Sequence, residues 1–598
     1  MATIVFGRRE EIDRRVSLTK VRKSSRTLLR ESNCVINSSL DEETPIVRQT
    51  HRGVFLVFGT PYFMDRALTE LSDDKIHRVI NEDYTKLDSS FLIFWIQEEG
   101  RKFSIISDRY GSIGVFWFHS EKLVFFSTEF RHALLAFKNR VPVNIDKSAI
   151  LEFLWFRRLF GTKTYVEGIS WLSAGSKIDW ELGSIPIETQ YWHPSSSRES
   201  HSKLDWADLL ANSASKSVEM ALQIKGSHGL MLSGGLDSRG LLGFGRDRYV
   251  TFTNAPRENT ETRVAARLAS LAQAKNEFIS RPDHYLDIVF NQAMELSNGM
   301  TQFYECQFVG YANRICDTVD NIHIGLFWDV FFCGHYMPKH LRKVLGKPLL
   351  HFTTDQIDDT EFIEQFMNSV SYRLKSTNLS SVVRQSEYRE NLHLMKERLS
   401  NIVSAGQEAG FEGVRLWEYM HLTNVGRHYS MLMARSLRPF LTVCVPALTN
   451  LNYELAFNLP PMYKTNWSVY QAMLKQTAPD LMEIINSNTH ISAKRDLRTQ
   501  SVIKCMRGLS NLAIRGQFNV SPDSSDRSWL PVRETLIRSE LAKEKIKRMI
   551  KAGRIMEIGL LDTDSVRHAY QATMSGSSDH SVFISQLLTL EHGFLDHL

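Results

Sequence analysis

Short runs of β-branched and aromatic residues follow one another along the first part of the chain. Between residues 52 and 137 they read GVFLVFG, SFLIFWI, KFSIIS, GVFWF and LVFFS, and turns such as Asp-Arg-Tyr-Gly separate some of them. This pattern predicts antiparallel hairpins. Residues 146–157 change to the apolar spacing of a helix, and residues 165–192 return to short strands. The pattern therefore predicts a first domain rich in β-structure, spanning residues 1–195.

The pattern changes after the polar segment SSSRESHSK, residues 195–203, which we interpret as a linker. Residues 204–224 have the spacing of an amphipathic helix. GLMLSGGLDS reads as a buried strand that runs into a turn, RYVTFTNAP and NIHIGLFWD read as further strands, and ETRVAARLASLAQA is helical in pattern. Strands that alternate with helices predict a parallel α/β domain. From about residue 358 the pattern is mostly helical, so the fold class is α/β and the second domain spans residues 203–598.

Composition excludes a chain that is disordered throughout, a collagen and a disulfide-stabilised miniprotein. A chain of 598 residues is long enough for two or more domains, and 43% hydrophobic with 23% charged residues is ordinary for a soluble protein. The first 30 residues carry nine Lys or Arg and three Asp or Glu, whereas the whole chain has a net charge of only +5. We interpret this basic run as a solvated face. A nucleic-acid partner is not favoured because the rest of the chain is close to neutral and no aromatic residues interleave with the basic run.

Targeting and redox signals are weak. The longest apolar stretches are far shorter than the roughly 20 residues that a membrane span needs. The first residues, MATIVFGRRE, have no apolar core of a signal peptide. The six cysteines are scattered without a CxxC pair, which indicates neither a zinc site nor a disulfide framework. We therefore expect a cytoplasmic protein without a membrane partner.

The strongest local signal is the string Leu230–Arg239, where an apolar strand runs into a glycine pair and then into a helix. Two glycines let the backbone turn sharply and bring N–H groups close to a ligand. Ser233 and Ser238 add hydroxyl donors, and the helix N-terminus adds a partial positive charge. This arrangement predicts a cradle for phosphate oxygens, with Asp237 placed to hold Mg²⁺. The string lacks the Gly-Lys-Ser/Thr ending of a Walker loop.

The string Ser-Gly-Gly-x-Asp-Ser resembles the signature of the ATP-pyrophosphatase, or PP-loop, family, in which the α-phosphorus of ATP is attacked to give an adenylate. Further stretches resemble the asparagine-synthetase-like branch of that family: 108–135, 143–175, 325–336 and 437–474. The resemblance covers nearly all of the chain from about residue 52. It implies an Ntn-like, class II amidotransferase-type α/β sandwich followed by a PP-loop synthetase domain.

The resemblance also implies the cofactors ATP and Mg²⁺ and a set of ligands for them. The residues expected to contact the nucleotide are Leu232, Ser233, Gly234, Gly235, Asp237, Ser238, Arg239 and Gly325. Asp237 and Asp329 are the expected metal ligands, since Asp329 matches the acidic residue of the second motif. Lys464 and Lys494 are alternative candidates for the lysine that stabilises phosphate charge. Glu418 is the candidate carboxylate for the incoming amine.

Several departures from the family's pattern bear on function. Glutamine-hydrolysing members begin Met-Cys-Gly and use the exposed cysteine as nucleophile, whereas this chain has Ala2 and its nearest cysteine is Cys34. Leu326, Val330 and Thr442 replace residues that asparagine-forming members usually have. Cys-less relatives include β-lactam synthetases and lasso-peptide cyclases. They adenylate a carboxylate that an amine of the same molecule attacks, which lowers the entropic barrier.

We therefore expect an ATP-dependent carbon–nitrogen ligase that releases AMP and pyrophosphate. The preferred substrate bears both a carboxylate and an amine, as a peptide closing on itself in lasso fashion or another specialised metabolite does. A partner protease or carrier protein would accompany such a pathway. Three alternatives stay open: an asparagine synthetase or related amide-forming enzyme that uses free ammonia or a partner glutaminase, a tRNA-modifying PP-loop enzyme, and a non-catalytic binding protein.

Overall fold

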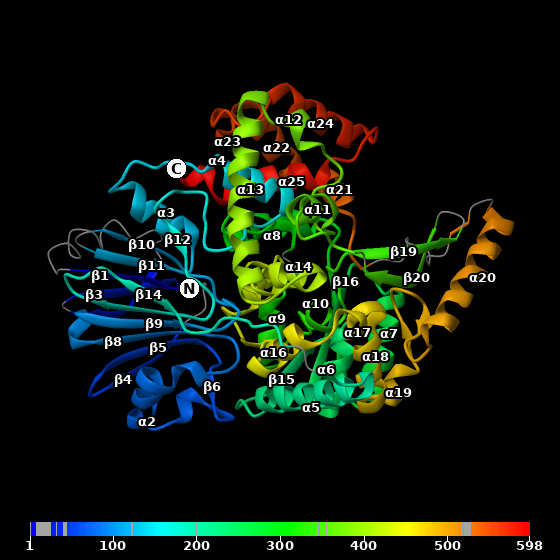
Figure 1. Cartoon of the computed structure of the whole chain (residues 1–598), viewed down its shortest axis with the longest axis horizontal. Helices are drawn as coiled ribbons and strands as arrows, with labels where there is room; N and C mark the ends of the chain where they lie inside the picture. Colours follow the sequence, from blue (N-terminus) through cyan, green and yellow to red (C-terminus); the bar gives the residue numbers. More distant parts are fainter. Residues whose placement is uncertain are drawn as a thin grey trace.

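The computed structural model describes residues 2–7, 25–31, 33–39, 45–120, 123–197, 200–305, 307–344, 347–354, 356–515, 518–519 and 528–598. Most of the basic N-terminal run, including residues 14, 15, 20, 22 and 23, lies outside these described residues. The structure combines antiparallel sheets, a parallel sheet and many helices, which confirms the α/β class (Figure 1). None of the described helices is both long enough and apolar enough to span a membrane.

Two antiparallel six-stranded sheets make up the first part of the chain. The first runs in the order β12 (Ser170–Trp171), β10 (Phe116–Ser120), β11 (Leu123–Ser127), β1 (Ala2–Gly7), β3 (Cys34–Ser39) and β2 (Ser25–Glu31). The second runs β14 (Ile187–Gln190), β13 (Ser176–Glu181), β9 (Lys102–Ser107), β8 (Phe91–Gln97), β5 (Gly53–Gly59) and β4 (Ile46–Thr50). The strands predicted between residues 52 and 137 are all present, and β1, β2, β3 and β4, which precede that range, are additional.

The two sheets pack face to face through an aromatic core. The rings of Phe6 and Phe103 stack at 4.1 Å, and Phe103 stacks on Trp180 at 5.1 Å. Helix α2 (Asp73–Arg78) lies outside the second sheet and α3 (Phe130–Lys138) outside the first (Figure 1). The inward faces are apolar because alternate strand residues point to the same side. The result contains the antiparallel pairing that the pattern predicted, in the layered α/β sandwich that the resemblance implied.

A five-stranded parallel sheet forms the centre of the second part. Its order is β17 (Lys275–Ser280), β16 (Tyr249–Ala255), β15 (His228–Met231), β18 (Asn321–His323) and β21 (Thr442–Cys444). Helices α6 (Asp237–Gly245) and α7 (Thr260–Leu271) connect β15 to β16 and β16 to β17. The chain then crosses to the other side of β15. The strand order therefore reverses between β15 and β18, where open α/β sheets bind ligands at the carboxyl ends of their strands.

Helices surround this sheet, beginning with α5 (Lys203–Leu222), which confirms the helix predicted over 204–224. A hairpin of β19 (Lys339–Val344) and β20 (Lys347–Thr354) packs beside α20, and the two project from the body (Figure 1). The helices after the hairpin are α11 (Phe362–Ser369), α12 (Leu379–Val382), α13 (Gln385–Glu408), α14 (Gly413–Leu422), α15 (Met431–Leu437), α16 (Asn450–Asn458), α17 (Pro461–Lys464), α18 (Ser468–Thr477), α19 (Pro479–Met482), α20 (Leu497–Arg515), α21 (Val532–Arg538), α22 (Glu540–Ala552), α23 (Arg554–Glu557), α24 (Thr563–Ser575) and α25 (Ser581–Gly593).

The Asp-Arg-Tyr-Gly turn that follows β9 connects the sandwich to the second part. The buried carboxylate of Asp108 accepts the backbone N–H groups of Phe91 at 2.8 Å and Tyr110 at 2.9 Å, which fixes the turn. The turn's outer side faces the helical region, where the N–H of Gly426 donates to the Tyr110 carbonyl at 3.0 Å. A turn with the sequence of a simple hairpin connection is therefore a packing contact between the two parts.

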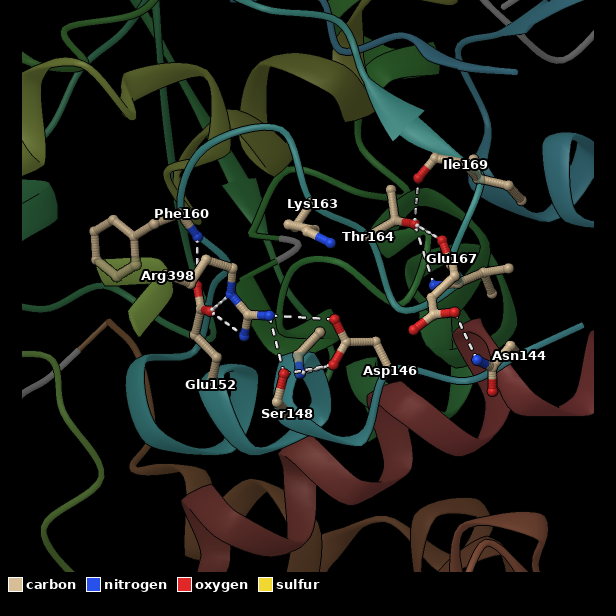
Figure 2. A network of polar contacts seen from close by, with 12 residues as sticks. Asn144, Asp146, Ser148, Glu152, Phe160, Lys163, Thr164, Glu167, Ile169 and Arg398 are labelled. Atoms are coloured by element: carbon tan, nitrogen blue, oxygen red, sulfur yellow. Dashed lines mark hydrogen bonds and ion pairs between the residues drawn. The ribbon is translucent and has the colours of Figure 1, made fainter. Parts of the chain in front are cut away.

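A partly buried arginine links the passage between the two parts to a helix of the second part. Figure 2 shows Arg398, from α13, between two carboxylates of the segment at the start of α4 (Lys147–Phe156). Its guanidinium lies 2.7 Å from Glu152 and 3.2 Å from Asp146, and it also donates to the Ser148 hydroxyl at 2.9 Å. Glu152 is almost fully buried and accepts the N–H of Phe160 at 2.6 Å. Burial raises the pKa of Glu152, and the charge of Arg398 opposes that shift.

Replacing Arg398 with Met is expected to lower the free energy of unfolding by about 2 kcal/mol, because the carboxylate of Glu152 stays buried without its charged partner. Urea unfolding of the purified protein measures the change. Lys396→Met is the matched control on the same helix, since its ion pair with Glu364 is largely exposed and contributes less than about 1 kcal/mol. Equal losses for the two variants would contradict a bracing role for Arg398.

Candidate functional site

The glycine loop, residues 232–236, joins the carboxyl end of β15 to the start of α6. Its conformation is fixed by two hydroxyls. The N–H of Ser233 donates to the Ser238 hydroxyl at 3.0 Å, and the N–H of Gly235 donates to the Ser233 hydroxyl at 3.2 Å. Leu232 extends the sheet by donating its N–H to the Phe252 carbonyl at 2.8 Å. The loop therefore places its glycine pair and the first turn of α6 at the point where the strand order reverses.

A second loop approaches the glycine loop from the end of β18. It passes through Gly325 and enters the short helix α10 (Trp328–Phe332). Phe327 caps this helix with φ of +74°, a left-handed conformation that is costly for an aromatic residue. A Cβ added at Gly325 would lie 2.9 Å from the Ser238 nitrogen and 3.0 Å from the Asp237 carbonyl carbon. Only glycine allows the second loop to approach the first turn of α6 this closely.

Gly325→Ala is expected to weaken nucleotide binding about tenfold and to cost about 1–2 kcal/mol of stability, since the added methyl would push against main-chain atoms that cannot rotate away. Equilibrium binding of ATP in the presence of Mg²⁺ measures the first effect and urea unfolding the second. An alanine variant that binds ATP as tightly as the wild type would show that the contact between the loops is not needed to form the site.

The two predicted metal ligands lie at the start of the helices that follow these loops. Asp237 is the first residue of α6, and Asp329 is the second residue of α10. Burial raises the pKa of Asp237 well above its usual range, and the nearby charge of Asp329 raises it further. The Oδ1 atom of Asp237 is buried and has no hydrogen-bond partner among the described residues. A pair of carboxylates that repel one another, with an oxygen left open, suits a cation.

The pair fits Mg²⁺ better than a metal held by protein ligands alone. No group of three or more His, Cys, Asp or Glu side chains is placed to hold a metal among the residues that the structure describes. Mg²⁺ takes oxygen ligands and usually binds through one or two carboxylates, with substrate phosphates and water completing its shell. Asp237 and Asp329 supply that number of carboxylates beside the glycine loop. When bound, Mg²⁺ would neutralise phosphate charge there.

The guanidinium of Arg239 binds main-chain carbonyls and is not placed to contact phosphate. The side chain is fully buried, and its Nη atoms donate to the carbonyls of Gly234, Leu481, Ile484 and Ile485 at 2.8–3.2 Å. The Gly234 carbonyl also accepts the N–H of Ser487 at 3.2 Å. The expected phosphate contact of Arg239 is therefore corrected to a bracing role: the residue ties the glycine loop to the segment that follows α19.

Glu418 and Lys464, predicted separately, contact each other. The Nζ of Lys464 donates to Glu418 Oε1 at 2.6 Å and to the Ala456 carbonyl at 2.5 Å, and both side chains are buried. Burial lowers the pKa of Lys464 and raises that of Glu418, while the attraction between the two charges opposes both shifts. The Lys464 Cβ lies 3.6 Å from the position of a Cβ at Gly334, shortly after α10. Lys464 therefore packs against the segment that follows α10.

Lys494, the alternative lysine, lies on the surface. Its Nζ is 2.5 Å from Glu483, and both side chains are more than half exposed. Two residues that the sequence prediction did not include lie closer to Asp329. His335 Nδ1 is 3.6 Å from Asp329 Oδ2, and the charge of Asp329 opposes the lowering of the Lys339 pKa by burial. Their position within ten residues of Asp329, on the loop and strand after α10, is the only sequence signal that could have indicated them.

Comparison with protein-family models gives no match, and comparison with curated proteins gives none either. Among solved structures, the chain is similar to the allosteric regulatory enzyme of purine biosynthesis, with 8% identity over 47% of this chain and 75% of that one and a TM-score of 0.20. It is also similar to glutamine phosphoribosylpyrophosphate amidotransferase from B. subtilis complexed with ADP and GMP, with 8% identity over 46% and 59% of the two chains and a TM-score of 0.18. These values are too low to assign a fold or an activity.

Proposed function

We propose that the chain is an ATP-dependent ligase of the PP-loop type that activates a carboxylate as an adenylate and joins it to an amine. One observation carries the proposal: Asp237, with an open carboxylate oxygen, is close enough to Asp329 to feel its charge, beside a glycine loop at the switch point of a parallel sheet. That arrangement supports binding of a polyphosphate with Mg²⁺.

In the proposed first step a carboxylate oxygen of the substrate attacks the α-phosphorus of ATP, and the bond to the bridging oxygen of pyrophosphate breaks. The backbone N–H groups of the glycine loop and the hydroxyls of Ser233 and Ser238 would hold the departing pyrophosphate. Asp237 and Asp329 would hold Mg²⁺. Arg239 acts indirectly, because it fixes the loop through main-chain carbonyls.

In the second step an amine attacks the carbonyl carbon of the acyl adenylate, AMP leaves with the oxygen, and the nitrogen loses a proton. We propose that the amine belongs to the substrate itself, as in a peptide closing on itself. The sandwich supports this source of nitrogen over glutamine, since Ala2 is the first residue of β1 and the Cys34 thiol is buried between the two sheets. Glutamine hydrolysis by the purified full chain would contradict this part of the proposal.

The test of the activity is ATP–pyrophosphate exchange across a set of carboxylates that includes aspartate and linear peptides. AMP release is measured in parallel, both without and with added ammonia. Exchange with a peptide and AMP release without ammonia is the expected result. Exchange with aspartate and AMP release only with ammonia would favour a free-ammonia amide synthetase. No exchange with any acid, in a folded sample that binds ATP, would contradict adenylation.

A further inference from the structure

A cavity of about 120 Å³, separate from the glycine loop and the metal pair, lies where β16 and β17 end. Pro256 follows β16, and Arg281 follows β17 and donates its N–H to the Ala255 carbonyl at 2.9 Å. The opposite wall is α21 together with Trp529 and Leu530, which precede it. None of the residues assigned to the glycine loop or to the metal pair lines this cavity.

Arg281 places a buried positive charge in the cavity wall. The residue is 5% exposed. Its Nη2 donates to the Ser528 carbonyl, and its guanidinium lies 3.5 Å from the centre of the Trp529 ring. Its Nη1 is buried without a hydrogen-bond partner among the described residues. A buried cation with an open donor is costly unless an anion pairs with it.

The remaining lining combines aromatic and aliphatic side chains with polar ones, which are Asp283, His284, Gln307, Thr535, Arg538 and Ser539. Tyr285 is fixed by donating its hydroxyl to the Val309 carbonyl at 2.7 Å, and its ring lies 6.4 Å from that of Trp529. Leu536, from α21, is buried against the same space. A cavity of roughly 150 Å³ with apolar walls is known to hold benzene, so this volume suits one ring or a short branched chain. The buried cation suits an anionic group, and the ring-lined space suits an apolar group of the same ligand.

We propose that this cavity binds a carboxylate carried on a ring-sized apolar group. The carboxylate accepts a hydrogen bond from Arg281 Nη1, and the apolar group packs against Trp529, Tyr285 and Leu536. The proposal goes beyond the proposed ligase activity and needs neither ATP nor Mg²⁺, so its test is separate from that of adenylation. Planar pairing with carboxylates and stacking on an aromatic face are the two properties that distinguish arginine from lysine.

Isothermal titration of the full chain with phenylacetate, without nucleotide or metal, tests the site. Phenylacetamide supplies the same shape without the charge, acetate supplies the charge without the ring, and inorganic phosphate supplies a different anion. We expect phenylacetate to bind at least about tenfold more tightly than any of the other three, since a charge-assisted hydrogen bond and the apolar contact must act together. Comparable binding of phenylacetamide, or of phosphate, would overturn the proposal.

Arg281→Met keeps the packing on Trp529 and removes the charge, and it is expected to weaken phenylacetate binding about 10- to 100-fold while leaving phenylacetamide binding unchanged. Arg246→Met is the matched control, because Arg246 forms an exposed ion pair with Asp480 and does not line the cavity. Unchanged phenylacetate binding in folded Arg281→Met would overturn the proposal. If that variant does not fold, the ligand series on the wild-type chain decides the question alone.

Discussion

Asp237→Asn is expected to lower ATP–pyrophosphate exchange by a factor on the order of 10³, which corresponds to about 4 kcal/mol of lost stabilisation of the phosphate charge. The amide keeps the shape of the side chain and loses the negative oxygen that would bind Mg²⁺. The stabilisation of the fold by Mg²⁺ and ATP together should disappear with it, because a ligand stabilises only the state that binds it. Exchange kinetics and thermal unfolding with and without Mg²⁺–ATP measure the two effects.

The same variant should change how stability depends on pH in the metal-free protein. Because the pKa of Asp237 is raised on folding, the folded state binds more protons than the unfolded state above the ordinary pKa near 3.9. Stability of the wild type therefore falls as pH rises from that value through the raised pKa. The amide side chain of the variant does not titrate, so the variant should gain stability relative to the wild type as pH rises through this window.

Asp247→Asn is the matched control for both measurements, since Asp247 is exposed just beyond the same helix α6. It should leave exchange unchanged and alter stability by less than about 0.5 kcal/mol. Retention of exchange and of the Mg²⁺–ATP stabilisation in folded Asp237→Asn would remove the observation on which the proposed function depends. A non-catalytic binding protein would then be the better interpretation.

Local pattern predicted the elements whose side chains repeat regularly. The strands 53–59, 102–107 and 123–127 were predicted with their observed limits, because each is an uninterrupted apolar or alternating run between turn residues. Strand β17, KNEFIS, was missed because it lies at the sheet edge and carries Lys and Glu. NIHIGLFWD was expected as one long strand, yet β18 stops at His323. The touching loops and the left-handed Phe327 that end it depend on the tertiary fold.

The site residues also divide into those that local sequence predicted and those whose place depends on tertiary contacts. The glycine loop was predictable because its strand, glycine pair and helix are consecutive in the sequence. The approach of Asp329 to Asp237 follows from strand order, which no local pattern shows. Arg239 was expected at the phosphate because it stands in the first helical turn, whereas its actual partners include carbonyls of α19 and of the segment that follows it. Contacts of that range depend on which surfaces the folded chain brings together.

The contact between Glu418 and Lys464 gives the second large prediction. Lys464→Met is expected to lower the free energy of unfolding by about 3–5 kcal/mol, because the Glu418 carboxylate stays buried without its partner. The double variant Glu418→Leu with Lys464→Met should recover most of that loss, since apolar residues of similar volume often replace a buried ion pair without cost. Urea unfolding of the two single variants and the double variant measures the coupling.

Lys494→Met is the matched control, because its ion pair with Glu483 is exposed and should contribute less than about 1 kcal/mol.

The same set of variants distinguishes a structural role of the pair from a role in the reaction. If the pair only stabilises the packing against the segment after α10, the double variant regains ATP–pyrophosphate exchange along with stability. If it folds well and exchange stays lost, Lys464 or Glu418 acts on the reacting groups themselves. Loss of exchange in folded Lys494→Met would instead assign the phosphate-stabilising lysine to the surface loop after α19, which in the structure also packs on the glycine loop through Ser487.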